Sequence, residues 1–158
     1  MTHLAALVAV LVLALSPGCS TTPTTPTPTP GVPRGPRTGL WLGTVADSSN
    51  GSGVLRVQLE ELVIGNAQSL LNGTWTTAFS DPTKNGSGDV SGSVSGTAVQ
   101  VTFRRAVPLS CANPGPVPAV YGSYFSLNLA IAGSTISGPY NFQTCTAPVT
   151  GALTLTMQ

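Results

Sequence analysis

The stretch Asn85–Arg105, NGSGDVSGSVSGTAVQVTFRR, contains the unit from which most of the chain is built. Valine or glycine alternates with serine over Val90–Ser95, and valine or phenylalanine alternates with polar residues over Val99–Arg104. This period of two gives each segment one apolar and one polar face, and the small residues Gly96-Thr97 between them suit a tight turn. The stretch therefore predicts a β-hairpin with one buried side.

A shorter pattern, apolar-x-Gly-x-apolar, recurs along the chain, centred on Gly43, Gly73, Gly92, Gly138 and Gly151. In a strand each of these glycines lies on the same face as the apolar residues that flank it, so the pattern predicts interior glycines. A missing side chain lets a strand coil sharply or lets a neighbouring ring pack over the backbone. Exposed glycines in a low-complexity secreted chain are the alternative.

Segments of this kind, separated by clusters of turn residues, predict eight strands with no convincing helix. The consecutive Glu60-Glu61 break the alternation of the second strand, as a bulge or a strand end would. Short sequential hairpins favour an all-β fold, an eight-stranded antiparallel up-and-down barrel that leaves no exposed edge, with a β-sandwich as the alternative. The predicted strands are Gly39–Ala46, Gly53–Ile64, Gln68–Ser80, Gly88–Gly96, Thr97–Ala106, Tyr121–Ala132, Ser134–Phe142 and Ala147–Met157.

The inward positions of these strands carry mostly bulky residues and no charge, which favours a filled barrel over a hollow one. Four aromatic residues among them are candidates for the core or for the lining of a ligand cavity: Trp41, Trp75, Phe103 and Tyr140. The other inward residues are Val45, Leu55, Val57, Leu59, Leu71, Val90, Val94, Val99, Val101, Leu127, Leu129, Ile131, Ile136, Phe142, Leu153, Leu155 and Met157.

Charge is scarce in this chain of 158 residues, of which 7% are charged. Six basic residues face five acidic ones, and Arg104-Arg105 is the largest basic cluster. This balance of charges gives no positive electrostatic potential that would attract a phosphate backbone, so nucleic acid is not an expected partner.

The N-terminal region differs in composition from the rest. Twelve apolar residues, Leu4–Leu15, would span about 18 Å as a helix, too short for a bilayer core of about 30 Å, and they predict a signal peptide. Residues 20–37 hold six Thr and six Pro, which predicts an extended stalk of up to about 55 Å. The expected organisation is a signal peptide at 1–18, an acylated cysteine and stalk at 19–37 and a barrel domain at 38–158.

The stretch Leu15-Ser16-Pro17-Gly18-Cys19-Ser20 resembles the lipobox of bacterial lipoproteins. The resemblance implies cleavage before Cys19, lipidation of its thiol and fatty acylation, and so an exported protein held on the membrane by its N-terminal lipid. Ser20 after the cysteine implies the outer membrane. Ordinary signal-peptide cleavage that leaves Cys19 as a spare thiol is the alternative.

Cys111 and Cys145 fall in the barrel domain. Export places them in an oxidising compartment, so a disulfide between them is expected. It would pin the proline-rich loop Val107–Pro118 to the loop after the seventh strand and make one rim rigid. Two thiols without a nearby histidine are too few ligands for zinc, and no metal or other cofactor is expected.

A catalytic site is not expected. The one histidine, His3, lies in the signal peptide, which removes the usual general base from the mature chain. Asp47, Asp81 and Asp89 lie in or beside predicted turns, where aspartate caps backbone N–H groups, and Glu60 and Glu61 point to opposite faces of a strand.

The glycine-punctuated barrel is similar in architecture to the calycins, the group of lipocalins and avidins, and to barrel-shaped bacterial protease inhibitors. Three functions follow as expectations. The first is a structural or partner-binding role in the cell envelope, with an envelope or secreted protein as the partner. The alternatives are a calycin-like binder of a small apolar ligand and a protease inhibitor that uses the proline-rich loop around Cys111.

Overall fold

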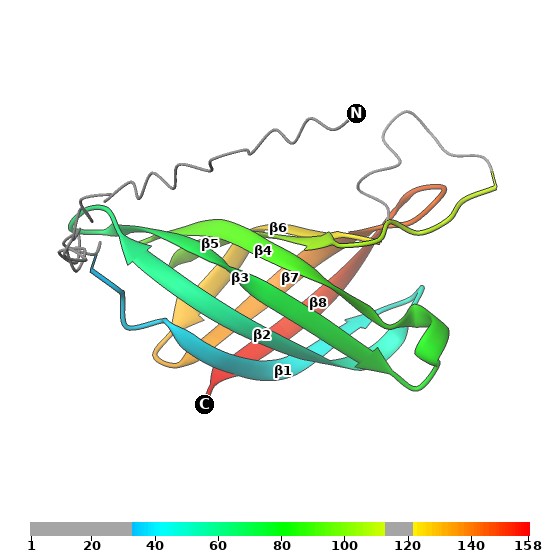
Figure 1. Cartoon of the computed structure of the whole chain (residues 1–158), viewed down its shortest axis with the longest axis horizontal. Coiled ribbons are helices and arrows are strands. Elements are labelled where there is room, and N and C mark those ends of the chain that lie inside the picture. The colour runs from blue at the N-terminus through cyan, green and yellow to red at the C-terminus, as the bar shows by residue number, and fades with distance from the viewer. Residues whose placement is uncertain (1–32, 113–121) are drawn as a thin grey trace, which may run out of the picture. The chain divides into compact units, whose positions relative to one another are not determined.

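A computed structural model describes residues 33–112 and 122–158, most of which form eight antiparallel strands closed into a barrel (Figure 1). A short 3-10 helix, η1 (Pro82–Lys84), lies between the third and fourth strands. The prediction of an eight-stranded antiparallel barrel is confirmed, and each strand matches its predicted range to within a few residues. The strands are β1 (Gly39–Asp47), β2 (Gly51–Val63), β3 (Gln68–Phe79), β4 (Gly86–Ser95), β5 (Ala98–Arg105), β6 (Tyr124–Ala132), β7 (Thr135–Gln143) and β8 (Pro148–Met157).

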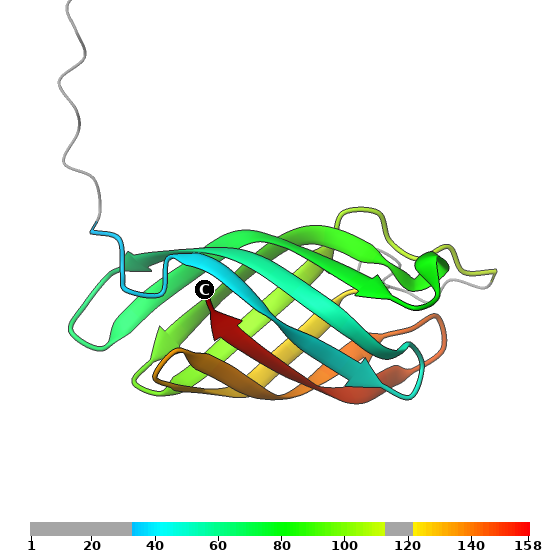
Figure 2. The same ribbon diagram turned by 90° about the horizontal axis from the view of Figure 1, so that it is seen from below.

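Each strand pairs with its neighbours in sequence, and β1 also pairs with β8, which closes the sheet (Figure 2). Trp41 of β1 illustrates the closure, because it lies opposite Val57 of β2 on one side and Met157 of β8 on the other. Closure pairs both edges of the sheet, which removes the exposed edge that would template aggregation.

The barrel interior is one cluster of buried apolar side chains from all eight strands. The predicted inward set is confirmed for its described members except Met157, which is partly buried and packs against the cluster. The side chain of Leu127 lies outside the described residues. Phe79 and Tyr124 are buried as well, at 7% and 3% exposure, although the sequence analysis did not place them inside.

The interior glycines occur where neighbouring chain comes too close for a side chain. A Cβ at Gly43 would overlap the carbonyl oxygen of Thr154 on β8, and a Cβ at Gly73 would overlap that of Gln58 on β2. At Gly151 the Tyr140 ring lies over the backbone. The predicted roles of these glycines, close strand approach and ring packing, are thus both confirmed at these positions.

The prediction of a bulge or strand end at Glu60-Glu61 is wrong. The β2–β3 register runs without a shift from Gly53 opposite Phe79 to Val63 opposite Ser69, so Glu61 continues the inward alternation of β2. Its side chain is fully buried, which also contradicts the expected absence of interior charge. The irregular strand is β6, whose register shifts against both neighbours between Phe125 and Ala130.

The two ends of the barrel differ. At the end where β1 begins, the segment Pro33–Thr38 packs across β2, with the amide of Gly35 donating to the carbonyl of Glu61 at 2.9 Å. We call this the Arg37 end. The chain therefore already contacts the barrel before residue 38, where the barrel domain was predicted to begin. At the other end lie the loops after β1, β3, β5 and β7, and we call it the disulfide rim after the bond described below.

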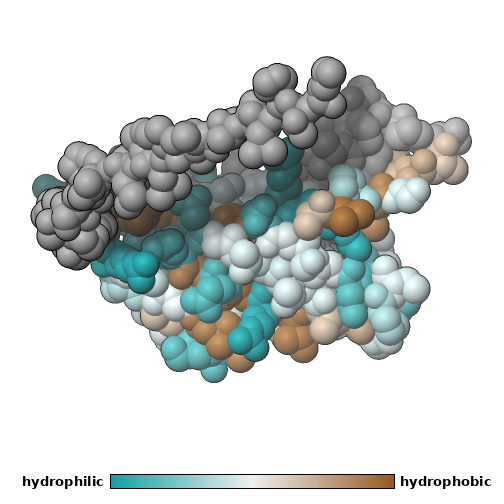
Figure 3. All heavy atoms as spheres, in the orientation of Figure 1, coloured by the Kyte–Doolittle hydropathy of each residue, from teal (hydrophilic) through white to brown (hydrophobic). Residues whose placement is uncertain are grey.

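The outer wall is mainly uncharged and polar. Figure 3 shows apolar residues on one face as separate groups among polar ones. Val54, Ile64 and Leu70 are exposed at 55%, 58% and 42%. Within the described ranges, no helix is long and apolar enough to cross a bilayer.

Candidate functional site

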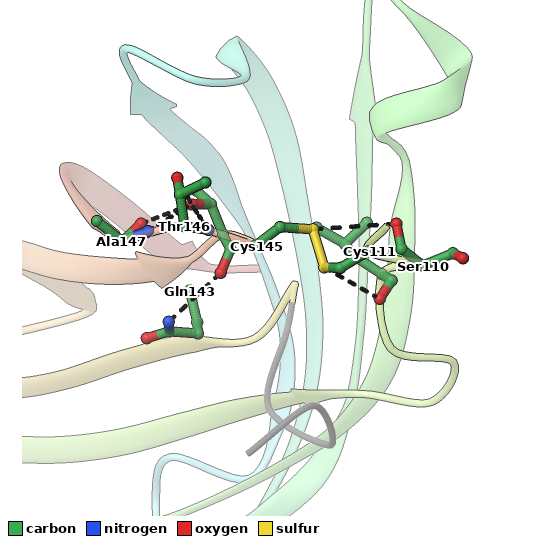
Figure 4. Close-up of a disulfide and its surroundings, with 8 residues drawn as sticks. Ser110, Cys111, Gln143, Cys145, Thr146 and Ala147 are labelled. Carbon is green, nitrogen blue, oxygen red and sulfur yellow. Dashed lines mark hydrogen bonds between the residues drawn. A yellow bond between two sulfur atoms is a disulfide. The ribbon is translucent and has the colours of Figure 1, made fainter. Parts of the chain in front are cut away.

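The disulfide rim is fixed by a bond between Cys111, in the loop after β5, and Cys145, in the loop after β7 (Figure 4). Their Cα atoms lie 5.6 Å apart, and the predicted pairing is confirmed. The Cys145 loop is also held by Thr144, whose hydroxyl accepts hydrogen bonds from the amides of Thr146 and Ala147 at 3.2 Å each. The bond and this turn together restrain the described residues around Cys111 and the loop after β7, which are distant in sequence.

A hollow of about 450 Å³ opens at the mouth of the barrel beside the disulfide. We call it the mouth hollow. Leu109, Phe142 and Val149 give it an apolar surface, while Lys84 and Arg105 give it positive charge. Its lining is Ser49, Asn50, Thr83, Lys84, Arg105, Leu109, Phe142, Thr144, Cys145, Thr146 and Val149.

A second hollow of about 350 Å³, the side hollow, lies next to it and shares Arg105. Val107, exposed at 75%, contributes an apolar surface to it. Its lining is Thr76, Thr77, Asn85, Gly86, Ser87, Arg105, Ala106 and Val107. Arg105 therefore stands between two neighbouring concavities of the same rim.

The two cations that line the mouth hollow are held by backbone carbonyl groups. The Lys84 ammonium donates to the carbonyl of Ser49 at 2.9 Å, and the Arg105 guanidinium donates through Nη2 to the carbonyl of Asn85 at 2.6 Å. Among the described residues, the ion pairs within 4.0 Å involve Arg34 and Arg37 at the other end of the barrel. Lys84 and Arg105 are thus fixed in place without a carboxylate partner in this part of the chain.

Two aspartates near the rim are occupied by their own turns. Asp47 accepts from the amides of Ser49 and Asn50 at 2.8 and 2.7 Å. Asp81 accepts from the hydroxyl and the amide of Thr83 at 2.7 and 3.0 Å, and these hydrogen bonds lower the pKa of Asp81. The predicted capping roles are confirmed for Asp47 and Asp81. For Asp89 the prediction is wrong, because it lies inside β4 on the exposed face, where the strand begins earlier than expected.

Below the hollows, aromatic rings fill the barrel. Tyr124 is the centre of this group, with ring centroids 5.4 Å from Trp75, 5.2 Å from Tyr140 and 4.9 Å from Phe142. Trp75 also meets Phe103 edge to face at 6.2 Å. Three of the four predicted aromatic candidates therefore belong to one packed cluster, which occupies the space that an interior ligand would need.

The polar atoms of this cluster are satisfied within the barrel. The Trp75 indole donates to the carbonyls of Asp89 and Arg104 at 3.1 Å each. The Tyr140 hydroxyl donates to the Asp47 carboxylate at 2.7 Å. Burial raises the pKa of Tyr124 to about 12. Burial and the adjacent Asp47 carboxylate raise the pKa of Tyr140 well above its ordinary range.

The fourth candidate, Trp41, lies at the Arg37 end, where its indole donates to the carbonyl of Arg37 at 3.0 Å. Glu61 lies there as well and accepts from the amide of Arg37 at 2.8 Å and from its guanidinium at 2.5 Å. Burial opposes ionisation of Glu61, but hydrogen bonds from Ser69 and Arg37 and the charge of Arg37 outweigh it, so the pKa of Glu61 lies below its ordinary value. This ion pair fastens the N-terminal segment to the barrel.

The acidic residues are dispersed. Asp47 and Asp81 accept hydrogen bonds from turn amides, and Asp89 lies on the outer wall. Glu60 pairs with Arg34 at 3.1 Å, and Glu61 pairs with Arg37. Within residues 33–112 and 122–158, no group of three His, Cys, Asp or Glu side chains is placed to hold a metal ion. The predicted lipidation site, Cys19, lies outside the described residues.

The sequence pattern did not predict the cationic rim or the buried ion pair. Lys84 lies in η1, before β4, and Arg105 ends β5, and the β4–β5 register, with Gly88 opposite Arg105, brings them to one hollow. Arg37 stands in the proline-rich segment, 24 positions before Glu61. The sequence does contain a pattern that predicts an inward position for Glu61, because this residue continues the alternation of Leu55, Val57 and Leu59.

Neither the protein-family models nor the curated proteins include a match to this chain. The class is therefore defined by the fold, a closed eight-stranded antiparallel barrel consistent with a calycin-like architecture.

Proposed function

We propose that this chain is a lipid-anchored protein of the bacterial cell envelope that binds a protein partner through its disulfide rim. The observation that supports this most is the covalent restraint of two rim loops beside two adjacent open hollows. A restrained surface loses little conformational entropy when a partner binds, which favours affinity.

The filled interior supports binding at the surface over carriage of a small ligand inside the barrel. Trp75, Tyr124 and Phe142 occupy the space beneath the rim. Ligand cavities in proteins usually enclose about 300–1,000 Å³ and bury most of the ligand. The two rim hollows reach that size but are open to solvent, which suits side chains of a protein partner.

The anchoring part of the proposal rests on the lipobox-like stretch and the threonine and proline tract. The tract leads to the Arg37 end of the barrel, and the nine residues of β1 separate that end from the rim, about 30 Å of strand. The rim therefore lies at the opposite end of the barrel from residue 33, where the described chain begins.

Metabolic labelling with a clickable fatty acid tests the anchor. We expect labelling and membrane fractionation of the wild-type chain, and loss of both in Cys19→Ala. The double variant Cys111→Ser/Cys145→Ser is the control, because it removes two thiols and should keep the label. Unchanged labelling in Cys19→Ala would disprove the anchor.

Photocrosslinking in intact cells tests the rim. A photoreactive amino acid is placed at Leu109 or Thr146 on the rim, and at Asn66 or Ser134 at the Arg37 end as controls. We expect a discrete crosslinked protein from the rim positions alone. Equal crosslinking from both ends, or none from the rim, would contradict the proposal.

A further inference from the structure

We infer that the rim recognises an acidic peptide segment, with a carboxylate held by Lys84 and Arg105 and with apolar side chains in the two hollows. This inference rests on the proposed function, since it names the chemistry of the partner at the same rim.

The shape of the rim suits a segment of extended chain. The mouth hollow and the side hollow share Arg105. In an extended peptide, every second side chain lies on the same side, about 7 Å apart. Two adjacent hollows, of about 450 and 350 Å³, can each accept one apolar side chain of such a segment.

Lys84 and Arg105 both keep hydrogen-bond donors for an incoming group. The described contact of Lys84 uses one of the three donors of its ammonium group, and that of Arg105 engages Nη2. These contacts orient both side chains, and donors remain for an incoming group. Arginine favours a carboxylate because its planar fork can donate two parallel hydrogen bonds.

The lining of the two hollows is complementary in charge to an acidic segment. Lys84 and Arg105 line the mouth hollow, Arg105 also lines the side hollow, and the described lining of both contains no carboxylate. Asp47 and Asp81 lie nearby, but their oxygens accept from turn amides, and those of Asp47 accept from Tyr140 as well. The lining of the hollows is therefore positively charged, while the negative charges of Asp47 and Asp81 lie outside that lining.

Apolar surface borders the cations in both hollows. Leu109 and Val149 are half-buried in the mouth hollow, and Val107 is exposed at 75% beside the side hollow. Apolar surface next to fixed cations suits a segment in which an acidic residue is flanked by apolar ones. A purely acidic ligand would leave these residues in water.

Panning of a random heptapeptide phage library against the purified full-length exported chain tests the inference. We expect enrichment of peptides in which Asp or Glu is adjacent to apolar residues. A synthetic copy of an enriched peptide should bind the Lys84→Glu variant at least about tenfold more weakly than wild type, and its affinity should fall as salt is raised.

Arg104→Glu is the matched control, because Arg104 neighbours Arg105 in sequence but is exposed on the outer wall of β5. We expect its affinity for the peptide to stay within about twofold of wild type. Lys84→Ala, which creates no repulsion, should show a smaller loss than Lys84→Glu. Thermal unfolding of each variant checks that the barrel remains folded.

Enrichment of peptides without acidic residues, equal binding to Lys84→Glu and wild type, or no enrichment at all would overturn the inference. Crosslinks from Leu109 together with any of these results would leave the rim as a protein-binding site and reject only its acidic specificity. Failure of the crosslinks would reject the proposed function itself.

Discussion

Arg37 and Glu61 form an ion pair at the Arg37 end in which the carboxylate is fully buried, although the residues stand 24 positions apart in the chain. The Arg37 side chain keeps 25% exposure, so the pair joins the interior to the surface. Glu60, the preceding residue, faces outward and pairs with Arg34 in an exposed contact, at 47% and 72% side-chain exposure. Adjacent residues on β2 thus provide a buried and an exposed ion pair for comparison.

Arg37→Ala should destabilise the barrel far more than Arg34→Ala. Removing Arg37 leaves Glu61 buried without its cation, which costs about 3 kcal/mol. An exposed pair such as Arg34–Glu60 contributes less than about 1 kcal/mol. Denaturant titration followed by tryptophan fluorescence measures both free energies of unfolding. Similar values for the two variants would show that the buried pair does not fasten the N-terminal segment.

The pKa of Glu61 predicts a dependence of stability on acid. Its pKa in the folded chain lies below its ordinary value, which is about 4.3 in an unfolded chain. The stabilisation by ionised Glu61 is therefore fully present above that pH and is lost as the pH falls through the folded pKa. Denaturant titrations at a series of pH values should show this decline for wild type and a weaker one for Glu61→Gln. Glu60→Gln is the control and should keep the wild-type profile.

Alkaline pH should also destabilise the barrel. The folded chain raises the pKa of Tyr124 to about 12, whereas an unfolded tyrosine ionises near about 10. Tyr124 therefore keeps its hydroxyl proton to a higher pH in the folded chain than in the unfolded chain. The stabilisation that this provides is fully present below about pH 10 and is lost as the pH rises through about 12. Tyrosinate absorbance during a pH titration reports the ionisation. Ionisation of all tyrosines near their ordinary pKa in the folded chain would contradict the prediction.

Breaking the Cys111–Cys145 disulfide should lower the free energy of unfolding without abolishing the fold. The bond joins residues 34 positions apart, and on the chain-entropy model a loop of this size is worth about 4 kcal/mol, less any strain. Cys111→Ser/Cys145→Ser measured against oxidised wild type gives the difference. Peptide mapping without reduction confirms the bond in wild type, and two free thiols there would remove the reason for calling the rim rigid.

Gly43→Ala should be strongly destabilising, whereas Gly65→Ala should not. A Cβ at Gly43 would overlap the carbonyl of Thr154, and backbone of a closed barrel cannot move away cheaply, so we expect a loss of about 3 kcal/mol or more. A Cβ at Gly65 has no atom within 4 Å, and alanine there should change stability by less than about 1 kcal/mol. Thermal unfolding of both variants tests whether the interior glycines are required by close strand approach.

Much of the fold followed from local pattern. The period of two along Asn85–Arg105 and its repeats determined the strands, because a sheet with one buried face requires that alternation. The inward residues and the glycine positions followed from the same alternation. The disulfide followed because the barrel domain has two cysteines and so one possible pairing.

Other features depended on tertiary structure. Glu61 is interior because its strand keeps register against β3, and its charge is tolerated because Arg37 arrives from a segment whose composition predicted no packing. The β6 irregularity arises from pairing with β5 and β7, which a single strand does not encode.

By itself the sequence determined alternating strand faces and interior glycines, because both depend on spacing along the strands, and one available disulfide, because the domain holds two cysteines. It favoured a barrel over a sandwich. Only the tertiary structure decided that Lys84 and Arg105 line one hollow together with Ser49, Phe142 and Cys145. Closing eight strands into a ring sets which loops meet at a rim, and that placement depends on the geometry of every strand between them.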